Sequence, residues 1–236
     1  MDRQVSPLLQ AASRPFLRAG IYPWQFARWK LRLDPVFVAL LRQGLLPDRG
    51  RLLDLGCGQG VLLALLAAAA DQYERGQWPV GWPPPPRNLL LHGFECHADR
   101  VMTAQRSLAG RATVTQCDIR TADFPAGRVT VLFDVLMYLE RPEQQRVLEK
   151  AAAAVEPGGV LLLRETDAEG GLAFQVSRWS ERLMQAGRGR LRDRLCYRSA
   201  LDWNRLLEAL DFSVTSEPVS AGTPFANMLF VARKKP

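Results

Sequence analysis

Residues 52–60, LLDLGCGQG, bring an acid and three glycines together in a pattern that suits ligand binding. Apolar residues lead into a short strand, Asp54 lies near its end, and Gly56, Gly58 and Gly60 alternate into the start of a helix. Glycine permits a tight turn with positive φ and lets a ligand approach the backbone closely. Since open α/β sheets bind ligands beyond the carboxyl ends of their strands, the string predicts a binding loop there.

Two nucleotide-binding uses of such a loop are excluded by the residues that follow it. A phosphate-binding loop requires Lys and Ser or Thr after its last glycine, whereas Gly60 is followed by Val61 and Leu62. The dinucleotide pattern G-x-G-x-x-G, started at Gly56, requires glycine at position 61. An acid two residues before the first glycine favours a cationic ligand, one with an ammonium and a sulfonium, over a pyrophosphate.

The nine residues resemble the first motif of the class I S-adenosylmethionine (SAM)-dependent methyltransferases and match it fully. The resemblance implies an enzyme with SAM as its cofactor. It also implies an α/β fold, a Rossmann-like, mainly parallel sheet of seven strands with helices on both faces. In the first motif it assigns five residues to the cofactor: Asp54, Gly56, Cys57, Gly58 and Gly60.

The end of the second expected strand carries Glu95, followed by Cys96. The resemblance places both at the cofactor, with the Glu95 carboxylate accepting hydrogen bonds from the ribose hydroxyls. Glu95 lies further from the glycine loop than the roughly 20 residues of a simple unit. The proline-rich residues 77–87 account for the excess.

The next two strand ends complete a series of four acids. The resemblance assigns Asp118 to the adenine amino group and Ile119 to the face of the ring. It places Asp134 and Val135 beside the methionyl part of the cofactor and its methyl group. Asp and Glu are also common turn residues, but four in order are hard to explain as turns.

Strands and helices are expected to alternate along the chain, which predicts a mainly parallel sheet covered on both faces. The periodicity predicts strands at 51–55, 89–95, 112–117, 129–133, 159–164, 212–217 and 226–232. It predicts helices at 36–45, 60–70, 98–109, 142–155 and 202–210.

Two regions are expected to be added to this core. Residues 1–48 form an N-terminal helical cap with breaks near Pro15, Pro23 and Pro35, and residues 49–236 form the SAM-binding domain. Within that domain, residues 77–87 are expected to be an exposed loop in polyproline conformation. Residues 166–210, after the fifth strand, form a substrate-cap insertion.

Methyl transfer from a sulfonium needs alignment and exclusion of water, and needs a base only when the acceptor still holds its proton. Tyr22, Tyr138 and Glu165 are candidates for positioning the acceptor or taking its proton, and each is equally explained as a structural residue. His97 is expected to border the adenosine, and neither histidine has a Cys or carboxylate constellation for a metal. The (D/N)PP(Y/F) motif of many amino-group methyltransferases is absent.

The net charge of +7 is concentrated in two segments, residues 1–51 and 173–210, around a slightly acidic centre. An anionic partner at a shared basic face fits this pattern, and an arginine-rich surface without a partner fits it too. Four cysteines without framework spacing, no secretory signal and no transmembrane segment predict a cytoplasmic protein with reduced thiols.

The chain also resembles, less specifically, methyltransferases of bacterial aryl polyene and related polyketide pathways. The likeness runs from the aromatic and basic N-terminus through KLRLDPVF to DVLMYL. It implies a small aromatic or phenolic acceptor, or an acyl group on an acidic carrier protein, in pigment or secondary-metabolite biosynthesis. Three alternatives stay open: an RNA methyltransferase, although no nucleic-acid-binding motif is visible, a catalytically silent SAM-binding protein, and a module that recruits partners through residues 78–86.

Overall fold

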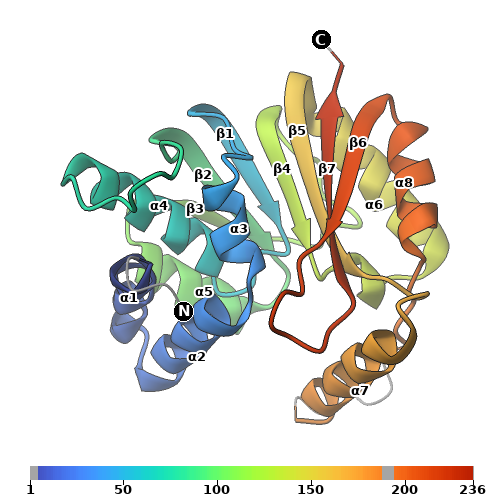
Figure 1. Ribbon diagram of the computed structural model, residues 1–236, viewed down its shortest axis with the longest axis horizontal. Helices are drawn as coiled ribbons and strands as arrows, with labels where there is room; N and C mark the ends of the chain where they lie inside the picture. The colour runs from blue at the N-terminus through green and yellow to red at the C-terminus, as the bar shows by residue number, and fades with distance from the viewer. Residues whose placement is uncertain (1–4, 188–193, 236) are drawn as a thin grey trace.

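The computed structural model describes residues 5–187 and 194–235, and these residues contain one seven-stranded sheet (Figure 1). The strand order is β3-β2-β1-β4-β5-β7-β6, and among these strands β7 runs in the direction opposite to the other six. The strands are β1 (Arg49–Leu55), β2 (Asn88–Glu95), β3 (Thr113–Gln116), β4 (Gly127–Phe133), β5 (Val155–Thr166), β6 (Phe212–Pro218) and β7 (Asn227–Lys234). The predicted Rossmann-like architecture is confirmed.

Side chains of the central strands alternate between two hydrophobic cores. In β1, Leu52 packs into the core on one face of the sheet, and Leu53 packs into the core on the other. In β5, Leu162 and Leu163 divide in the same way. Because successive strand residues point to opposite faces, an uninterrupted apolar strand requires helices on both sides.

The helices supply those two layers. The helical elements are α1 (Ser6–Ser13), η1 (Arg14–Arg18), α2 (Ile21–Leu33), α3 (Val36–Arg42), α4 (Val61–Glu74), α5 (Ala98–Leu108), η2 (Leu136–Tyr138), α6 (Arg141–Ala154), α7 (Gly171–Gly187) and α8 (Ala200–Glu208). Residues of α1 to α5 pack into the first core, and residues of α6 and α8 pack into the second. The sheet is therefore covered on both faces.

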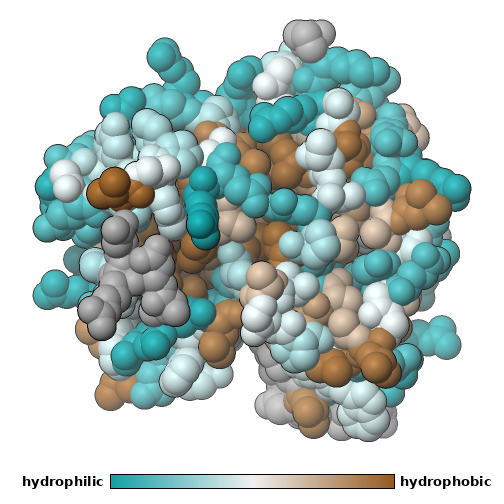
Figure 2. Space-filling model, in the orientation of Figure 1, coloured by the Kyte–Doolittle hydropathy of each residue, from teal (hydrophilic) through white to brown (hydrophobic). Residues whose placement is uncertain are grey.

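The order of the strands reverses between β1 and β4, which are neighbours although β2 and β3 lie between them in sequence. Ligands of open α/β sheets bind at such a point, beyond the carboxyl ends of the strands. These ends lie at the lower edge of the view in Figure 1, with α2 on one side and α7 on the other. Figure 2 shows the lower outline of the molecule notched between these two sides.

The N-terminal helices differ from the prediction at one of three prolines. The predicted breaks near Pro15 and Pro35 are found, since α1 ends at Ser13 and α2 ends at Leu33. The predicted break near Pro23 is wrong, because Pro23 lies in the first turn of α2. A first-turn residue has no helical partner for its N–H, so proline is tolerated there.

The proline-rich residues 77–87 are not the fully exposed loop that the sequence predicts. Pro79 and Pro85 are buried, and the indole Nε1–H of Trp78 donates a 3.0 Å hydrogen bond to the carbonyl of Pro83. The rings of Trp78 and Trp82 meet edge to face at 5.8 Å and pack against the first core. The tryptophans of the loop therefore pack within the protein, which argues against a loop that recruits partners.

The fifth strand starts earlier than predicted, at Val155, and passes through the expected break at residues 157–159 with an irregular register against β4. Of the expected insertion, residues 166–210, the part from 188 to 193 lies outside the described residues. The rest contains α7 and α8, and Trp203 and Leu207 of α8 are buried in the second core. The second half of this segment thus belongs to the layer that covers the sheet.

Candidate cofactor and acceptor site

The three glycines of the loop between β1 and α4 all have positive φ but serve different purposes. A Cβ on Gly56 would lie 2.3 Å from Val135, and one on Gly60 would lie 2.8 Å from Leu108. A Cβ on Gly58 would meet no atom within 4 Å. Gly56 and Gly60 therefore permit close packing within the protein, whereas Gly58 borders open space that a ligand can fill.

Asp54 is the buried acid of this loop. Its side chain accepts no hydrogen bond from any residue in the described part of the chain. Burial, and secondly the negative charge of Glu95, raise the pKa of Asp54 to about 7. A buried carboxylate without a partner is costly, and a bound cation would supply the missing partner.

Glu95 joins the glycine loop to the start of α5. Its Oε2 accepts a 3.1 Å hydrogen bond from the Gly58 N–H, and its Oε1 accepts a 2.9 Å bond from the His97 N–H. Burial raises the pKa of Glu95, but the hydrogen bonds from His97 and the charge of Arg100 lower it by more. The net result is a pKa below the usual value. Glu95 is therefore the ionised acid of the pair that it forms with Asp54.

The prediction that neither histidine has a Cys or carboxylate constellation is wrong for His97. Its Nδ1 lies 2.6 Å from Glu95 Oε1 and 3.1 Å from Cys96 Sγ, and the three ligand atoms lie within 4.8 Å of one another. Burial and the Glu95 charge raise the pKa of Cys96 to about 11. A protonated thiol is a poor metal ligand, and this cluster shares Glu95 with the cofactor loop.

Asp118 follows β3 and is paired with a residue that the sequence analysis passed over. Arg120 donates hydrogen bonds of 3.0, 2.9 and 2.6 Å to the Asp118 carboxylate, and the pKa of Asp118 is lowered chiefly by them. Ile119 is buried in the second core. A cavity of about 270 Å³ lies on the α6 side of Asp118, where Glu143 and Arg146 help to line it, away from the glycine loop.

Asp134 follows β4 with φ of 55°, a left-handed conformation that side chains rarely adopt. Its carboxylate accepts hydrogen bonds from the buried guanidinium of Arg164, and Lys30 Nζ lies 3.6 Å from its Oδ2. Arg164 also donates to both oxygens of Asp34, at 2.5 and 2.6 Å. Two cations and two acids thus form a neutral network that ties the N-terminal helices to the sheet.

Glu165, the neighbour of Arg164 in β5, is a buried acid on the opposite face of the strand. Its Oε1 accepts a 2.8 Å hydrogen bond from the Leu136 N–H. Burial, and secondly the charge of Asp134, raise the pKa of Glu165 to about 8. Glu165 thereby orients the segment after β4, which includes Val135, the residue packed on Gly56.

Two tyrosines contact residues of α7. The Tyr138 hydroxyl donates a hydrogen bond to the buried carboxylate of Glu181. The Tyr197 hydroxyl is buried without a partner among the described residues, and its ring meets Phe174 edge to face at 5.1 Å. Burial, followed by the charges of Glu181 and Glu165, raises the pKa of Tyr197 to about 12. A carboxylate that accepts hydrogen bonds and several aromatic rings therefore lie next to the end of β4.

The structure brings most predicted site residues to one edge of the sheet. Gly56 and Cys57 both donate from their backbone N–H groups to the carbonyl of Phe94, next to Glu95. Tyr22 is not brought there, because it is exposed and lies about 12 Å along α2 from Lys30 at the rise of an α-helix.

Sequence reasoning missed Asp34, Arg164, Glu181 and Tyr197. Arg164 carries a signal that could have been used: it is a lone charge inside the apolar strand sequence VLLLRET. A charged side chain in a strand buried on both faces needs a partner of opposite sign. Asp34 and Tyr197 have no comparable local signal, since Arg164, which pairs with Asp34, and Phe174, which contacts the Tyr197 ring, are distant from them in the chain.

The residues present fit SAM on two observations of this structure. Gly58 leaves open space where a ligand can lie against the backbone, and Asp54 is a buried carboxyl group without a hydrogen-bond partner among the described residues. SAM carries an ammonium and a sulfonium, and its ribose diol is suited to an ionised carboxylate such as Glu95.

Comparisons with known proteins agree with this fit. Over 118 residues the chain is 31% identical to carboxy-S-adenosyl-L-methionine synthase of Chromohalobacter salexigens, a match covering 48% of this chain and 38% of that protein. An O-methyltransferase family protein from Burkholderia thailandensis superposes with a TM-score of 0.66 at 16% identity, covering 93% of this chain and 62% of the other.

An O-methyltransferase from neocarzinostatin biosynthesis, solved with S-adenosyl-L-homocysteine and 1,4-dihydroxy-2-naphthoic acid, superposes with a TM-score of 0.61 at 21% identity. That match covers 95% of this chain and 60% of the other. The chain thus spans less than two thirds of the length of each of these three proteins. At these identities the two superpositions show the shared fold.

The family is given by the sequence match that covers most of the chain. Residues 29–217 match the profile of the family described as methyltransferase domain. This range runs from α2 through β6 and includes the glycine loop and all four strand-end acids. The chain belongs to this family.

Proposed function

We propose that this enzyme methylates a hydroxyl group of a small aromatic acceptor. The observation that carries the proposal is the cluster of Tyr138, Glu181, Tyr197 and Phe174 beside the end of β4. It combines aromatic rings, against which an aromatic acceptor can pack, with a buried carboxylate that already accepts a hydrogen bond from a phenolic hydroxyl. The solved relative with a bound dihydroxynaphthoic acid supports the same acceptor chemistry.

The cofactor supplies a methyl group on a sulfonium, so the protein has to bind the acceptor, align its oxygen and remove its proton. A phenol holds its proton at neutral pH, since its pKa is about 10. In our proposal Tyr138 positions the acceptor and Glu181 takes the proton of its hydroxyl. The acceptor oxygen would then replace sulfur on the methyl carbon, and the electron pair of the broken C–S bond would stay on sulfur. Asp134 is not available as a base, because its carboxylate is paired with Arg164.

The cofactor contacts are part of the proposal. Asp54 and Glu95 bind the ammonium and the ribose diol, and Gly56, Cys57, Gly58 and Gly60 provide the backbone of the loop. Cys96, Asp118 and Ile119 border the adenosine, and Asp134 and Val135 border the methionyl part. We place the enzyme in the cytoplasm, because all four cysteines are unpaired thiols.

Methyl-labelled SAM should be incubated with the enzyme and three pools of acceptors: small phenols and naphthols, acyl groups on an acidic carrier protein, and RNA. We expect label in the small phenols and naphthols. An acceptor whose hydroxyl is already replaced by a methoxy group should take up no label. Label in the carrier pool or in RNA alone would replace the proposal by the other acceptor. Binding of SAM without transfer to any pool would indicate a silent SAM-binding protein.

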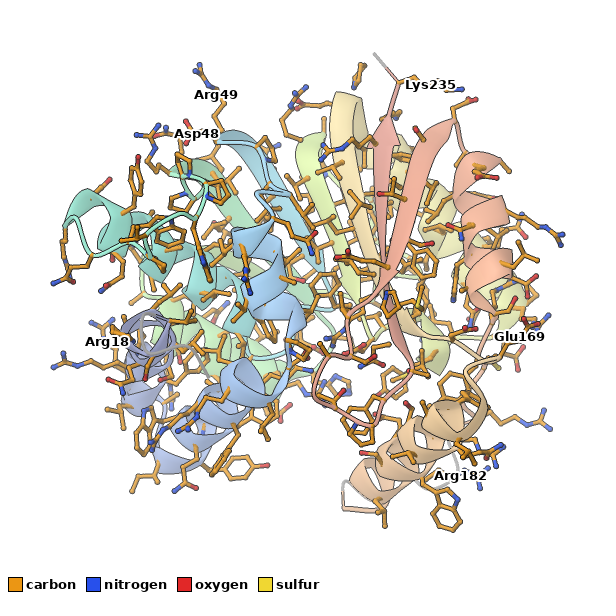
Figure 3. The ribbon with its side chains drawn as sticks, viewed as in Figure 1. Arg18, Asp48, Arg49, Glu169, Arg182 and Lys235 are labelled. Atoms are coloured by element: carbon orange, nitrogen blue, oxygen red, sulfur yellow. The ribbon has the colours of Figure 1, made fainter. Side chains whose placement is uncertain are left out.

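The role of Glu181 needs a matched control. Glu181→Gln should lower kcat by about 100-fold, within the range of general base catalysis, and change KM for the acceptor little. Glu169→Gln alters an exposed acid just before α7, labelled in Figure 3, and should leave kcat unchanged. Equal kcat values for Glu181→Gln and the unaltered enzyme would remove Glu181 from the mechanism.

A further inference from the structure

Helix α7 has a stripe of large apolar residues on its outer face. The side chains that it buries include Ser177 and Glu181. Four large apolar residues of α7 face solvent at a helical spacing of four, three and four: Leu172 is 85% exposed, Val176 41%, Trp179 64% and Leu183 68%. An amphipathic helix of a globular protein normally places such a stripe on the core, so an outward stripe marks a binding surface.

Helix α2 repeats this arrangement on the other side of the carboxyl edge of the sheet. Tyr22, Trp29 and Leu33 are each more than half exposed and lie on one side of the helix, seven and four residues apart. Arg28 and Arg32, one turn apart, are exposed beside them. The exposed face of α2 therefore consists of an apolar stripe next to a basic one.

Both stripes lie at the same end of the molecule. In Figure 1, α2 and α7 flank the carboxyl ends of the parallel strands, and Figure 2 shows the notch between the two sides. Figure 3 shows Arg182 on α7 at this end and Arg49 at the opposite end. A flat surface that contacts this end can touch both helices at once.

The charge of this end is positive. Residues 5–33 contain four arginines and one lysine and no acid. On α7, Arg182 is exposed, whereas the acid Glu181 is turned inward and accepts a hydrogen bond from Tyr138. A second copy of the chain would bring two positive surfaces together, which opposes self-association through this end.

We propose that the end formed by α2 and α7 docks on an anionic lipid surface. Trp29, Trp179 and Leu183 enter the boundary between headgroups and acyl chains, and Arg28 and Arg32 lie at the phosphates. A single acidic helix of a carrier protein would cover one stripe and leave the other exposed, whereas a membrane covers both. No helix in the described part of the chain is long and apolar enough to cross a bilayer, so contact is confined to its surface.

Docking in this way turns the acceptor side of the site toward the bilayer. An acceptor dissolved in the membrane then reaches Tyr138 without crossing water. The docking itself does not depend on the proposed acceptor, because it rests on α2 and α7 alone. It can therefore be tested without any methyl transfer.

Sedimentation with vesicles tests the proposal on the full chain. The probes are vesicles of phosphatidylcholine alone and of phosphatidylcholine with about one third phosphatidylglycerol, at low and high salt. We expect binding to the anionic vesicles, weakened by salt. Trp179→Ser with Leu183→Ser, and separately Arg32→Glu, should weaken binding at least about tenfold. The matched controls are Leu90→Ser, an exposed leucine on β2, and Arg49→Glu, and both should bind like the unaltered protein.

Calorimetric titration with SAM shows that each variant is folded. Failure to bind anionic vesicles would overturn the proposal, and so would equal weakening of binding by Leu90→Ser and by Trp179→Ser with Leu183→Ser. So would a dimer in light scattering that Leu183→Ser dissociates, since a second copy would then cover the stripe. Binding of an acidic carrier protein that depends on Arg32 and Trp179, with no binding of vesicles, would assign the face to the carrier instead.

Discussion

Asp54 and Glu95, at the ends of the neighbouring parallel strands β1 and β2, form a pair in which Glu95 is ionised and Asp54 holds its proton near neutral pH. Burial raises the pKa of Asp54 to about 7, with the charge of Glu95 as the second cause. In the absence of a ligand the pair therefore carries less than the two negative charges of two ionised carboxylates. A cationic ligand changes this balance, because it stabilises the ionised form of Asp54.

The affinity for SAM is expected to depend on pH through Asp54. Below pH 7 Asp54 holds its proton in the free protein, and binding of a cation must release it. The affinity should therefore fall as the pH falls below about 7, approaching tenfold per pH unit, and level off above it. Calorimetric titrations across this range measure the slope. Asp54→Asn should remove it, whereas Asp48→Asn, an acid before β1, should retain it; a slope that survives in Asp54→Asn would contradict the assignment.

Gly58→Ala and Gly56→Ala should separate binding from folding. A Cβ at position 58 has space within the protein, so this variant should lose about 1 kcal/mol of stability to its positive φ and lose SAM affinity. A Cβ at position 56 collides with Val135, so that variant should lose several times more stability. Urea unfolding and SAM titration together measure both effects. Normal affinity in a folded Gly58→Ala variant would place the ligand elsewhere.

The Arg164 network should stabilise the fold more than a surface ion pair does. Arg164→Met removes the buried guanidinium and leaves Asp34 and Asp134 with Lys30 as their remaining cation, so the free energy of unfolding should fall by about 3–5 kcal/mol. Arg111→Met breaks a pair with Asp71 at the surface and should cost about 0–1 kcal/mol. Equal losses of unfolding free energy in the two variants, measured by urea unfolding, would show that the buried network stabilises the fold no more than a surface ion pair does.

Acid should also weaken the network. Burial raises the pKa of Asp34, but the charges of Arg164 and Lys30 outweigh it and bring the pKa to about 2. A carboxyl with a lowered pKa contributes stability above its unfolded value of 3.8, and this contribution is lost as the pH falls from there through 2. The contribution of Arg164, measured as the difference between the unaltered protein and Arg164→Met, should shrink over that interval.

Glu165→Gln distinguishes a positioning role from a base. Glu165 holds its proton in the folded protein up to a pH of about 8, whereas the unfolded chain loses it near 4.5. The unaltered protein should therefore lose stability as the pH rises from 4.5 to 8, and Glu165→Gln, which can still accept the Leu136 N–H, should lack this loss. Its kcat should stay within a few-fold of normal. A kcat lowered 100-fold or more in a normally folded variant would make Glu165 the base.

Local sequence patterns predict much of this structure, but they do not predict contacts between residues that are far apart in the chain. The glycine loop, the mainly parallel sheet and four acids at one edge follow from LLDLGCGQG, from alternation of strands and helices, and from the rule that parallel strands share their carboxyl edge. The predicted break at Pro23 is wrong because a proline in the first turn of a helix and a proline that ends a helix look alike in sequence. The partnership of Arg164 with Asp34 joins residues 130 positions apart, which no local spacing encodes.

Titration of SAM into Glu95→Gln tests the central claim, that the strand-end acids and the glycine loop hold the cofactor, most directly. Glu95 Oε2 lies at the Gly58 N–H, beside the open space that the loop borders. Exchange of the ionised carboxylate for an amide removes a charge-assisted acceptor for the ribose diol, and SAM affinity should fall at least about tenfold. Asp48→Asn, which alters an acid at the far end of β1, should bind SAM normally. Unchanged affinity in a folded Glu95→Gln variant would contradict the account.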